Sequence, residues 1–352
     1  MFDFDQPPIK ASIATATSQH TAYNHSDAIL VIAAAPINER RIVALWTELE
    51  CFVVGSTNHV VLSTPHWARP IMHRLLQEVR RSIPHFASGD VQIEARFFEN
   101  QRYDAGLWCD GLQGLDSKYK HFLLLNDSIF ALRRFTGILD TLRSTNHDVV
   151  SLIYNKFREE EKIWIESVFR GFNAHGLSVF MNHSCVPASD PSYSDCLSIM
   201  GYKGQKRCIV ENHEIGLAWR FPPIILNRTD NKISGLYDGM VPQRMYSRKS
   251  FTPPTWTKHR DYWKFLVKEK EFPAAKSYYF KPQILQNCTE YLNRTYLKEI
   301  NYDLAKQMIN DTTGDTRHVF ETPISKVVFG SALGCKKSQI AIWDRACNKS
   351  LK

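Results

Sequence analysis

The sequence predicts an α/β protein built on a doubly wound, mostly parallel β-sheet. Short apolar runs alternate with segments of helical spacing over roughly 150 residues, which is the pattern of repeated βαβ units. The first run, residues 27–35 (DAILVIAAA), is almost continuously apolar. Such a run is typical of a strand that is buried on both faces of a parallel sheet. With 352 residues, of which 43% are apolar, the chain is long enough to bury a sizeable core.

Five strands and four helices are expected in alternation before residue 157. The strands are expected at 27–35, 59–63, 91–98, 119–125 and 148–154. The helices are expected at 38–49, after a cap at Thr64, at 103–115 and at 130–142. Further along, the spacing predicts a strand within 163–172, a helix at 208–221, a loop-like region at 225–257, and helices at 260–268, 283–297 and 302–310.

The chain divides into three parts. Residues 1–25 are polar and without periodicity, and we expect a loose leader there. Residues 26–257 are expected to form the α/β core. Residues 258–352 are expected to form a mostly helical C-terminal annex that packs on the core.

Composition excludes several classes of function. The formal net charge is +8, and the basic residues are spread along the chain without a nucleic-acid-binding signature. The sequence also lacks a G-x-S-x-G elbow, a Walker A loop, an H-E-x-x-H motif and a Rossmann glycine fingerprint. These absences weaken the hydrolase, kinase, metalloprotease and dehydrogenase interpretations.

Two features bear on the compartment. No apolar run approaches the roughly 18 residues of a membrane span, so a soluble protein is expected, cytoplasmic or peripheral to a membrane. The eight cysteines form no CxxC pair and no zinc spacing, and we interpret them as free thiols. However, the chain contains eight N-x-[ST] sequons, where about two are expected by chance. That excess keeps a Golgi lumen open as the alternative, with a membrane anchor upstream.

The strongest local signal is the segment Asn126-Asp127-Ser128, which follows an apolar strand. An acidic residue at the end of a strand can hold a divalent cation that bridges two phosphates. The competing interpretation is a helix cap, for which Asn, Asp and Ser are also the preferred residues.

Three further segments carry candidate site residues. Asn100 and Asp104 flank a loop after the third strand, where they either cap a helix or contact sugar and ribose hydroxyls. Glu211 and Glu214 are three apart beside His213, and they form either a solvated helix face or the place of a catalytic base. The fourth segment is Phe272–Lys276, in which Lys276 is either solvated or neutralises a diphosphate.

In their order along residues 27–285, these segments resemble the rhamnan-synthesis F-type family of polysaccharide glycosyltransferases. Leu125-Asn126-Asp127-Ser128 matches a family hallmark in full, and Asn100 and Asp104 match an Asn-rich loop in which this chain has Arg102 in place of the usual Gly. The remaining matches are a segment with Glu166 for the family's Gln, Glu214-Ile215-Gly216, and a tail with Trp263 and Phe272-Pro273-Ala274-Ala275-Lys276.

The resemblance implies a GT-A-like fold and transfer of a sugar, such as rhamnose, from a nucleotide-sugar donor to a glycan, polysaccharide or lipid-linked acceptor. It assigns Asp127 to a Mn²⁺ or Mg²⁺ ion or to the donor diphosphate, and Glu214 to the catalytic base. The implied donor contacts are Asn100, Asp104, Asn126, Ser128 and Lys276. Glu166 and Glu211 are placed on the acceptor side.

Two other functions remain open at this point. One is a catalytically inactive, glycan-binding relative. The other is a nucleotidyltransferase-like enzyme, which requires a basic, glycine-rich loop near the first strand, and the sequence has no such loop. In this sequence only Arg40 and Arg41 supply positive charge there.

Overall fold

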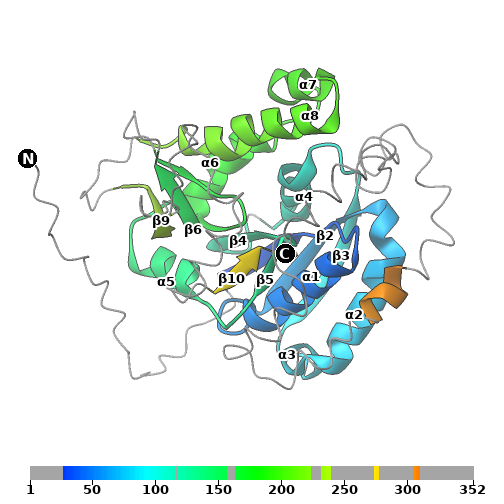
Figure 1. The fold of residues 1–352 in the computed structure, drawn as a ribbon. Helices are drawn as coiled ribbons and strands as arrows, with labels where there is room; N and C mark the ends of the chain where they lie inside the picture. The colour runs from blue at the N-terminus through cyan, green and yellow to red at the C-terminus, as the bar shows by residue number, and fades with distance from the viewer. Residues whose placement is uncertain are drawn as a thin grey trace, which may run out of the picture.

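The computed structural model describes residues 27–115, 117–156, 163–222, 231–238, 273–276 and 304–309. These residues form an α/β structure with helices on both sides of a central sheet (Figure 1), which confirms the predicted fold class. Within them, no helix is long and apolar enough to cross a lipid bilayer.

An eight-stranded sheet forms the centre of the molecule. Its strands are β1 Ala28–Ala33, β2 His59–Pro65, β3 Gln92–Phe98, β4 His121–Asn126, β6 Val149–Lys156, β7 Ile163–Ile165, β8 Phe169–Asn173 and β9 Ile233–Asp238. The order is β3-β2-β1-β4-β8-β6-β7, and β9 also pairs with β6. Strands β1 to β4 are mutually parallel, whereas β8 runs antiparallel to both β4 and β6. The sheet is therefore mixed beyond β4.

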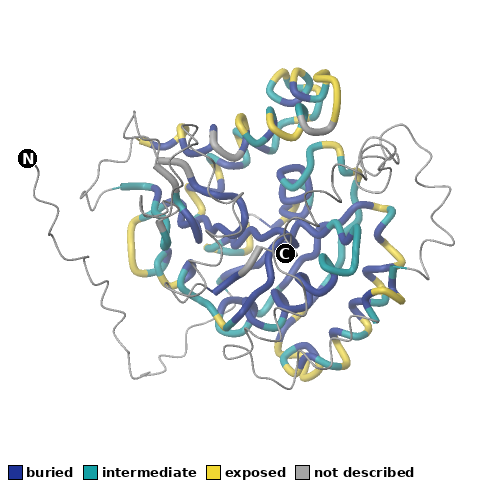
Figure 2. The backbone as a smooth tube through the Cα atoms, viewed as in Figure 1, coloured by how far each residue is buried: buried dark blue, intermediate teal, exposed yellow. Residues whose placement is uncertain are grey.

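The apolar run of the first strand supplies both layers of the core. Leu30 and Ile32 point to one face of β1, and Ile29 and Val31 point to the other. All of them are fully buried (Figure 2). A strand with this composition can only lie in the middle of a sheet that is covered on both sides.

Helices cover the two faces unequally. On the face of Leu30 lie α1 Glu39–Cys51, α2 Arg69–Ser82, α3 Pro84–Ala87 and α5 Gly137–Ser144. On the face of Ile29 lie α4 Tyr103–Leu112, α6 Ala174–Ser184 and the short α9 Gly216–Ala218. The pair α7 Pro191–Ser198 and α8 Tyr202–Ile209 lies beyond α4 and α6, at the top of Figure 1.

Several expected elements differ from the structure around the strand ends. Thr64 does not cap a helix, because β2 continues to Pro65 and α2 begins after the short 3-10 helix His66–Ala68 with a proline in its first turn. The expected helix at 130–142 is replaced by strand β5 Ile129–Ala131 and by α5. The three apolar residues of β5 pair with a distant strand, so their helical spacing is overridden by tertiary contacts.

The second half of the core contains further corrections. The strand expected within 163–172 is two strands, β7 and β8. The helix expected at 208–221 is divided into α8, the π-helix η3 Val210–Ile215 and α9. The region 225–257, expected to be loop-like, contains β9, whose alternating residues pair with the edge of β6.

Two described pieces of the expected C-terminal annex contact the core. Strand β10 Ala274–Lys276 pairs antiparallel with β5. Residues 304–309 are helical, and Ala305 and Met308 are buried in the core cluster that includes α1 and α2. The boundary placed after residue 257 and the helices expected at 260–268 and 283–297 lie outside the described residues.

Four cysteines form disulfides, contrary to the expectation of free thiols. Cys109 on α4 pairs with Cys185 at the end of α6, and Cys196 on α7 pairs with Cys208 on α8. Their spacing in sequence follows no framework, because each pair is brought together by the packing of helices. Cys51 is a buried free thiol on α1, and burial raises its pKa well above the usual thiol value.

We predict that Gly176→Ala destabilises the protein by about 2 to 3 kcal/mol. A Cβ at this position of α6 would lie 2.0 Å from the backbone oxygen of Asp148, which is fixed in the sheet. Gly204→Ala is the matched control, because it is also helical and its Cβ would meet only side-chain atoms of Ile199, with Cγ2 at 2.7 Å. Ile199 is 40% exposed and can turn toward solvent, whereas a backbone oxygen cannot. Urea unfolding of both variants measures the difference, and equal stabilities would contradict the proposed tight approach of α6 to the sheet.

Candidate functional site

The order of the strands creates a switch point between β1 and β4. From β1 the chain continues outward to β2 and β3 on one side, and it then returns to place β4 on the other side. In open α/β sheets, ligands bind at such a point, beyond the carboxyl ends of the strands. The loop 34–38 after β1 and the segment Asn126-Asp127-Ser128 after β4 both lie there, as the pairing of Ala33 with Asn126 shows.

Asp127 joins the two strand ends. Its Oδ2 accepts a hydrogen bond of 2.8 Å from the backbone N–H of Ala35, after β1. Its Oδ1 accepts a hydrogen bond of 2.7 Å from the guanidinium of Arg41, in the first turns of α1. The Asp127 side chain is 5% exposed and that of Arg41 is 29% exposed, so Arg41 lies between the carboxylate and solvent.

The electrostatics of Asp127 are set by this burial. Burial raises the pKa of Asp127 above the usual carboxyl value, while the Arg41 guanidinium lowers it. The nearby carboxylate of Asp104 raises it further, and the hydrogen bond from Ala35 lowers it. A buried carboxylate beside a second one is stable only with positive charge close by, and here Arg41 supplies that charge.

The predicted donor residues Asn126, Ser128 and Asp104 form one hydrogen-bond network beside Asp127. The Asn126 amide donates to Oδ2 of Asp104 at 3.1 Å, and its oxygen accepts from the hydroxyl of Ser128. These contacts replace the helix-cap interpretation, because residues 127–128 form a turn that leads into β5 instead of a helix. The structure thus brings Asp104, on α4, beside the end of β4, although it lies 22 positions before Asn126 in the sequence.

The loop before α4 is held in an unusual conformation. Tyr103 has a φ of 56°, and it is the one non-glycine residue with positive φ among those described. Such a conformation is strained for a residue with a bulky side chain and is found often at binding sites. In the same loop, Oδ1 of Asn100 is buried and accepts no hydrogen bond within the described part of the chain. An oxygen of this kind is suited to a hydroxyl of a ligand.

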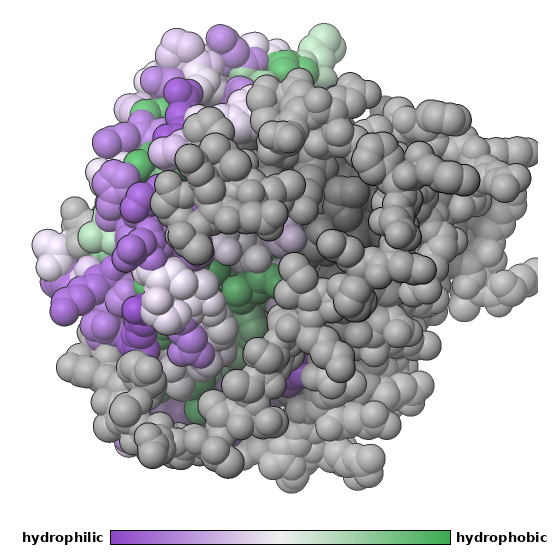
Figure 3. All heavy atoms as spheres, turned by 90° about the vertical axis from the view of Figure 1, so that its left-hand side faces the viewer, coloured by the Kyte–Doolittle hydropathy of each residue, from purple (hydrophilic) through white to green (hydrophobic). Residues whose placement is uncertain are grey.

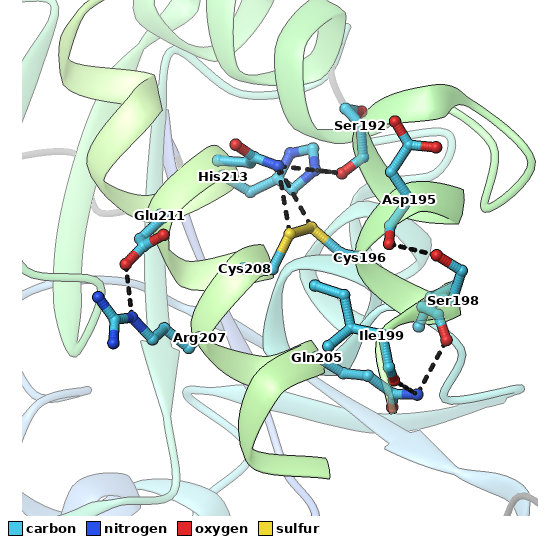
Figure 4. The surroundings of a disulfide bond; sticks show 12 residues. Ser192, Asp195, Cys196, Ser198, Ile199, Gln205, Arg207, Cys208, Glu211 and His213 are labelled. Atoms are coloured by element: carbon cyan, nitrogen blue, oxygen red, sulfur yellow. Dashed lines mark hydrogen bonds and ion pairs between the residues drawn. A yellow bond between two sulfur atoms is a disulfide. The ribbon is translucent and has the colours of Figure 1, made fainter. Parts of the chain in front are cut away.

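Contacts from α8, from the segment before α7 and from α4 itself hold that loop. Arg102 donates to the backbone oxygen of Val186 at 2.6 Å and to Asp110 at 2.9 Å, and Tyr103 donates to Gln205 on α8. The α7–α8 pair has only a small apolar cluster of its own, and the Cys196–Cys208 disulfide links its two helices (Figure 4). Arg102, which stands where the resembling family has Gly, therefore has a structural role in this chain: its side chain holds the loop in place.

Glu166 lies at the same edge of the sheet. It is 8% exposed on the connection from β7 to β8. Two residues later, the backbone oxygen of Val168 accepts from the N–H of Asn126 at 3.3 Å. This antiparallel connection places Glu166 near the carboxyl end of β4, although the sequence separates the two by 40 positions.

Strand β10 brings Lys276 to the same turn. The backbone of Lys276 is in register with Ile129, which directly follows Ser128. The backbone oxygen of Pro273 also accepts from the N–H of Leu132 at 2.8 Å. The tail that the sequence analysis associated with the donor is thus placed beside Asp127; the Lys276 side chain lies outside the description.

The predicted acidic pair is not on a regular α-helix. Glu211 and Glu214 lie in the π-helix η3, so a separation of three residues does not place them on one α-helical face. Glu211 is half-exposed and pairs with Arg207 at 2.7 Å. No described contact joins it to Asp127. The side chain of Glu214 lies outside the description.

His213, between the two glutamates, is fully buried. Its ring stacks on Tyr193 with 3.7 Å between centroids, and its Nε2 is 3.3 Å from the backbone oxygen of Ser192. Burial lowers the pKa of His213 to about 4. The neutral imidazole therefore serves as part of the packing between η3 and α7.

The sequence analysis named Arg41 only under the nucleotidyltransferase alternative, and it missed Ala35 and Tyr103 as parts of the site. Arg41 lies in the first turn of the helix that follows the first strand. Its position in the sequence therefore indicates a positively charged side chain near the end of that strand. The N–H of Ala35 and the positive φ of Tyr103 have no sequence signal, because both depend on the path of the backbone.

The described surface is mostly hydrophilic on the side shown in Figure 3. Large apolar side chains are exposed at Ile199 and Met200, in the turn between α7 and α8, and at Trp219 after α9. Met200 is 97% exposed. Two adjacent apolar side chains form too small a patch to identify a partner.

Comparisons with known proteins name no family. No family model matches the chain, and no curated protein sequence does either. One similar solved structure is 4-diphosphocytidyl-2C-methyl-D-erythritol synthase from Anaerococcus prevotii, with 14% identity, a TM-score of 0.34, and coverage of 62% of this chain and 90% of that one. HddC from Yersinia pseudotuberculosis has 9% identity, a TM-score of 0.32, and coverage of 42% and 77%. At these values neither likeness bears on function.

We predict that Arg41→Ala destabilises the protein by about 2 to 3 kcal/mol, because it leaves the Asp127 carboxylate buried without its cation. In an Asp127→Asn background the same change is expected to cost about 1 kcal/mol or less. A double-mutant cycle from urea unfolding gives the coupling energy. Arg40→Ala is the control, with an expected effect within about 0.5 kcal/mol. Additive effects of the two changes would show that the pair is not coupled.

We predict a loss of stability as the pH falls from about 6.5 to about 4, through His213. The unfolded chain binds a proton at this residue near pH 6.5, whereas the folded state does so only near pH 4. The unfolded state therefore binds more protons in this window, and the free energy of unfolding decreases by about 2 kcal/mol. Denaturant melts across this range measure the slope. In His213→Gln, which retains a hydrogen-bond donor, the total decrease in unfolding free energy over this pH range should be smaller by that amount.

Proposed function

We propose that the chain is a glycosyltransferase that uses a nucleotide-sugar donor. The observation that carries the proposal is the position of Asp127, at the switch point between β1 and β4, with Arg41 and the N–H of Ala35 on its two oxygens. Cationic and N–H groups at the carboxyl edge of a sheet are what a bound diphosphate requires. The motif resemblance described above adds the sugar-transfer chemistry to this geometry.

Arg41 and the start of α1 would bind the donor diphosphate. The helix has 13 residues and is capped by Asn38, whose side chain accepts from the N–H of Arg41. Its positive end faces the loop after β1, and the guanidinium offers a planar pair of donors for phosphate oxygens. In this proposal the bound diphosphate replaces Asp127 as the ion-pair partner of Arg41. The main catalytic contribution of the site is then to stabilise the leaving diphosphate.

The sugar end of the donor would meet Asn100, Asp104 and Glu166. Asn100 has a buried oxygen with no described donor, and Asp104 retains one carboxylate oxygen beyond its bond to Asn126. An inverting transfer also requires a carboxylate that removes the acceptor's proton. Glu166 lies near the carboxyl end of β4, where such a base is needed. Glu214 remains the candidate from the motif resemblance. Glu211 forms an ion pair with Arg207.

A divalent cation remains part of the proposal. Asp127, Asp104 and the oxygens of Asn126 and Ser128 are the hard donors that Mg²⁺ and Mn²⁺ prefer. In the structure, both oxygens of Asp127 already accept hydrogen bonds, from Arg41 and Ala35. Among the described residues, no three His, Cys, Asp or Glu side chains gather at one point to hold a metal. Asp127 and Asp104 would therefore hold a cation only if Arg41 turned away from Asp127 and the diphosphate itself supplied further oxygens.

The acceptor and the sugar are proposed from the resemblance alone. The acceptor class is a glycan, a polysaccharide or a lipid-linked saccharide, and the sugar class includes rhamnose. A peripheral membrane contact would bring the site close to a lipid-linked acceptor.

Nucleotidyl transfer is the second candidate, and Arg41 favours it. That chemistry needs positive charge after the first strand, and the structure places Arg41 at the switch point. The two candidates differ in their substrates. A glycosyltransferase is stabilised by an intact nucleotide sugar, whereas a nucleotidyltransferase is stabilised by a nucleoside triphosphate and releases pyrophosphate in the presence of a sugar phosphate.

We predict that one nucleotide sugar among UDP-, GDP- and dTDP-linked donors raises the melting temperature by a few degrees in the presence of Mn²⁺. The gain should be lost in Arg41→Ala, which removes the diphosphate's cation. Asp127→Asn should lose the Mn²⁺-dependent part of the gain and retain the rest. Differential scanning fluorimetry measures all three.

Glu78→Gln on α2 is the control variant, because Glu78 pairs with Arg81 on its own helix, away from the switch point. It should bind the donor as the unaltered protein does. Stabilisation by nucleoside triphosphates alone would favour nucleotidyl transfer. If no nucleotide shifts the folded protein, the glycosyltransferase proposal fails and a glycan-binding role is favoured.

A further inference from the structure

We propose that Asn182 is a site of N-linked glycosylation, on a chain that folds in an oxidising lumen. Two independent observations lead to this inference: the disulfides and the exposure of one particular sequon. It does not depend on the proposed function, because neither observation involves the switch point.

The first observation is that two disulfides link separate helices. The Cα atoms of Cys109 and Cys185 are 5.2 Å apart, and those of Cys196 and Cys208 are 5.3 Å apart. Both separations suit a relaxed bridge. Disulfides of this structural kind form and persist in secretory compartments and are rare in the cytosol of most cells. The same compartments contain the machinery that glycosylates asparagine.

The second observation is the exposure of Asn182. The sequence Asn182-His183-Ser184 is an N-x-[ST] sequon in the last turn of α6, and Asn182 is exposed. His183, the middle residue, points to η3, where its Nε2 is 2.9 Å from the backbone oxygen of Asn212. A glycan on Asn182 would therefore extend into solvent while the neighbouring residue keeps its contact.

A second sequon serves as an internal contrast. Asn126-Asp127-Ser128 has the same pattern, but Asn126 is 5% exposed and its amide donates to Asp104. A glycan on this buried nitrogen would have no room and would displace the hydrogen bond to Asp104. Among the described residues the structure thus separates a sequon that can carry a glycan from one that cannot. The other six, at Asn24, Asn227, Asn287, Asn293, Asn310 and Asn348, lie outside the described residues.

The burial of Ser184 sets the order of events. Ser184 is fully buried, its Oγ has no hydrogen-bond partner in the described structure, and its backbone oxygen accepts from Tyr193 at 2.6 Å. A transferase that recognises the Ser184 hydroxyl must reach it before α6 and α7 pack together. Cys185 follows immediately, so the modification must also precede closure of its bridge to Cys109.

The chemical step needs a lipid-diphosphate-linked oligosaccharide as the co-substrate. The side-chain nitrogen of Asn182 forms a bond to the anomeric carbon of the first sugar. The bond from that carbon to the diphosphate oxygen breaks, the lipid diphosphate leaves with the electron pair, and the amide loses one proton. No oxidation or reduction occurs.

The test is a glycopeptide map of the full chain, directed into the yeast secretory pathway by a cleavable leader. The purified protein is treated with peptide-N-glycosidase in ¹⁸O-water, which labels each formerly glycosylated asparagine. The Asn182 peptide should carry the label and the Asn126 peptide should not. Asn182→Gln and Ser184→Ala should each lose the label at this site. The Ser184 change should leave folding intact, because its hydroxyl makes no described hydrogen bond.

A second measurement does not require a folded product. Translation of the full chain with microsomes should give an endoglycosidase-sensitive band shift that is smaller by one glycan in both variants. The same peptide map of the protein from the cells that make it naturally should show a labelled Asn182 and a Cys109–Cys185 bridge. Unlabelled Asn182 or reduced Cys109 and Cys185 in that material would overturn the proposal.

Discussion

The buried ion pair between Asp127 and Arg41 is the constraint on which the organisation of the site depends. Asp127 directly follows β4, Arg41 belongs to α1, and the N–H of Ala35 after β1 completes the contact. One side chain therefore fixes the relative position of two strand ends and a helix. Because Asp127 is almost fully buried, it can remain charged only while a cation stays beside it. A ligand that draws Arg41 away must leave compensating positive charge or a proton on Asp127, so ligand binding and the charge of this site are linked.

The first half of the fold could be predicted from periodicity because β1, β2 and β4 are buried on both faces. The residues of β1, and those of β4 after His121, are buried almost without exception, and such runs are hard to mistake. The edge position of Asn126-Asp127-Ser128 followed from the same pattern, and Asn100 and Asp104 were associated with it by order along the chain. What periodicity could not give was the antiparallel insertion of β8 between β4 and β6, since the direction of a strand leaves no trace in its composition.

The parts that sequence reasoning missed depend on contacts between distant segments. The spacing of Phe130 to Leu142 suits a helix, yet β5 is drawn into pairing with β10, far along the chain. Glu211 and Glu214 lie in the π-helix η3, so the α-helical spacing used to place them on one helix face does not apply. The disulfides unite cysteines on α4 and α6 and on α7 and α8, and only the packed structure defines those pairs. For β5 the local preference was clear and a tertiary contact outweighed it, whereas the cysteine spacings carried no preference at all.

The pairing of β5 with β10 has a consequence for any shortened form of the protein. Strand β5 directly follows Ser128, and its described strand partner comes from residues 274–276. A chain cut by a protease before Pro273 would lose that partner and leave the backbone groups of an apolar segment, Ile129–Ala131, open to pairing with another molecule. Such a fragment could retain most of the sheet and still self-associate beside its own binding site. A fragment that keeps β5 paired must therefore extend at least to Lys276.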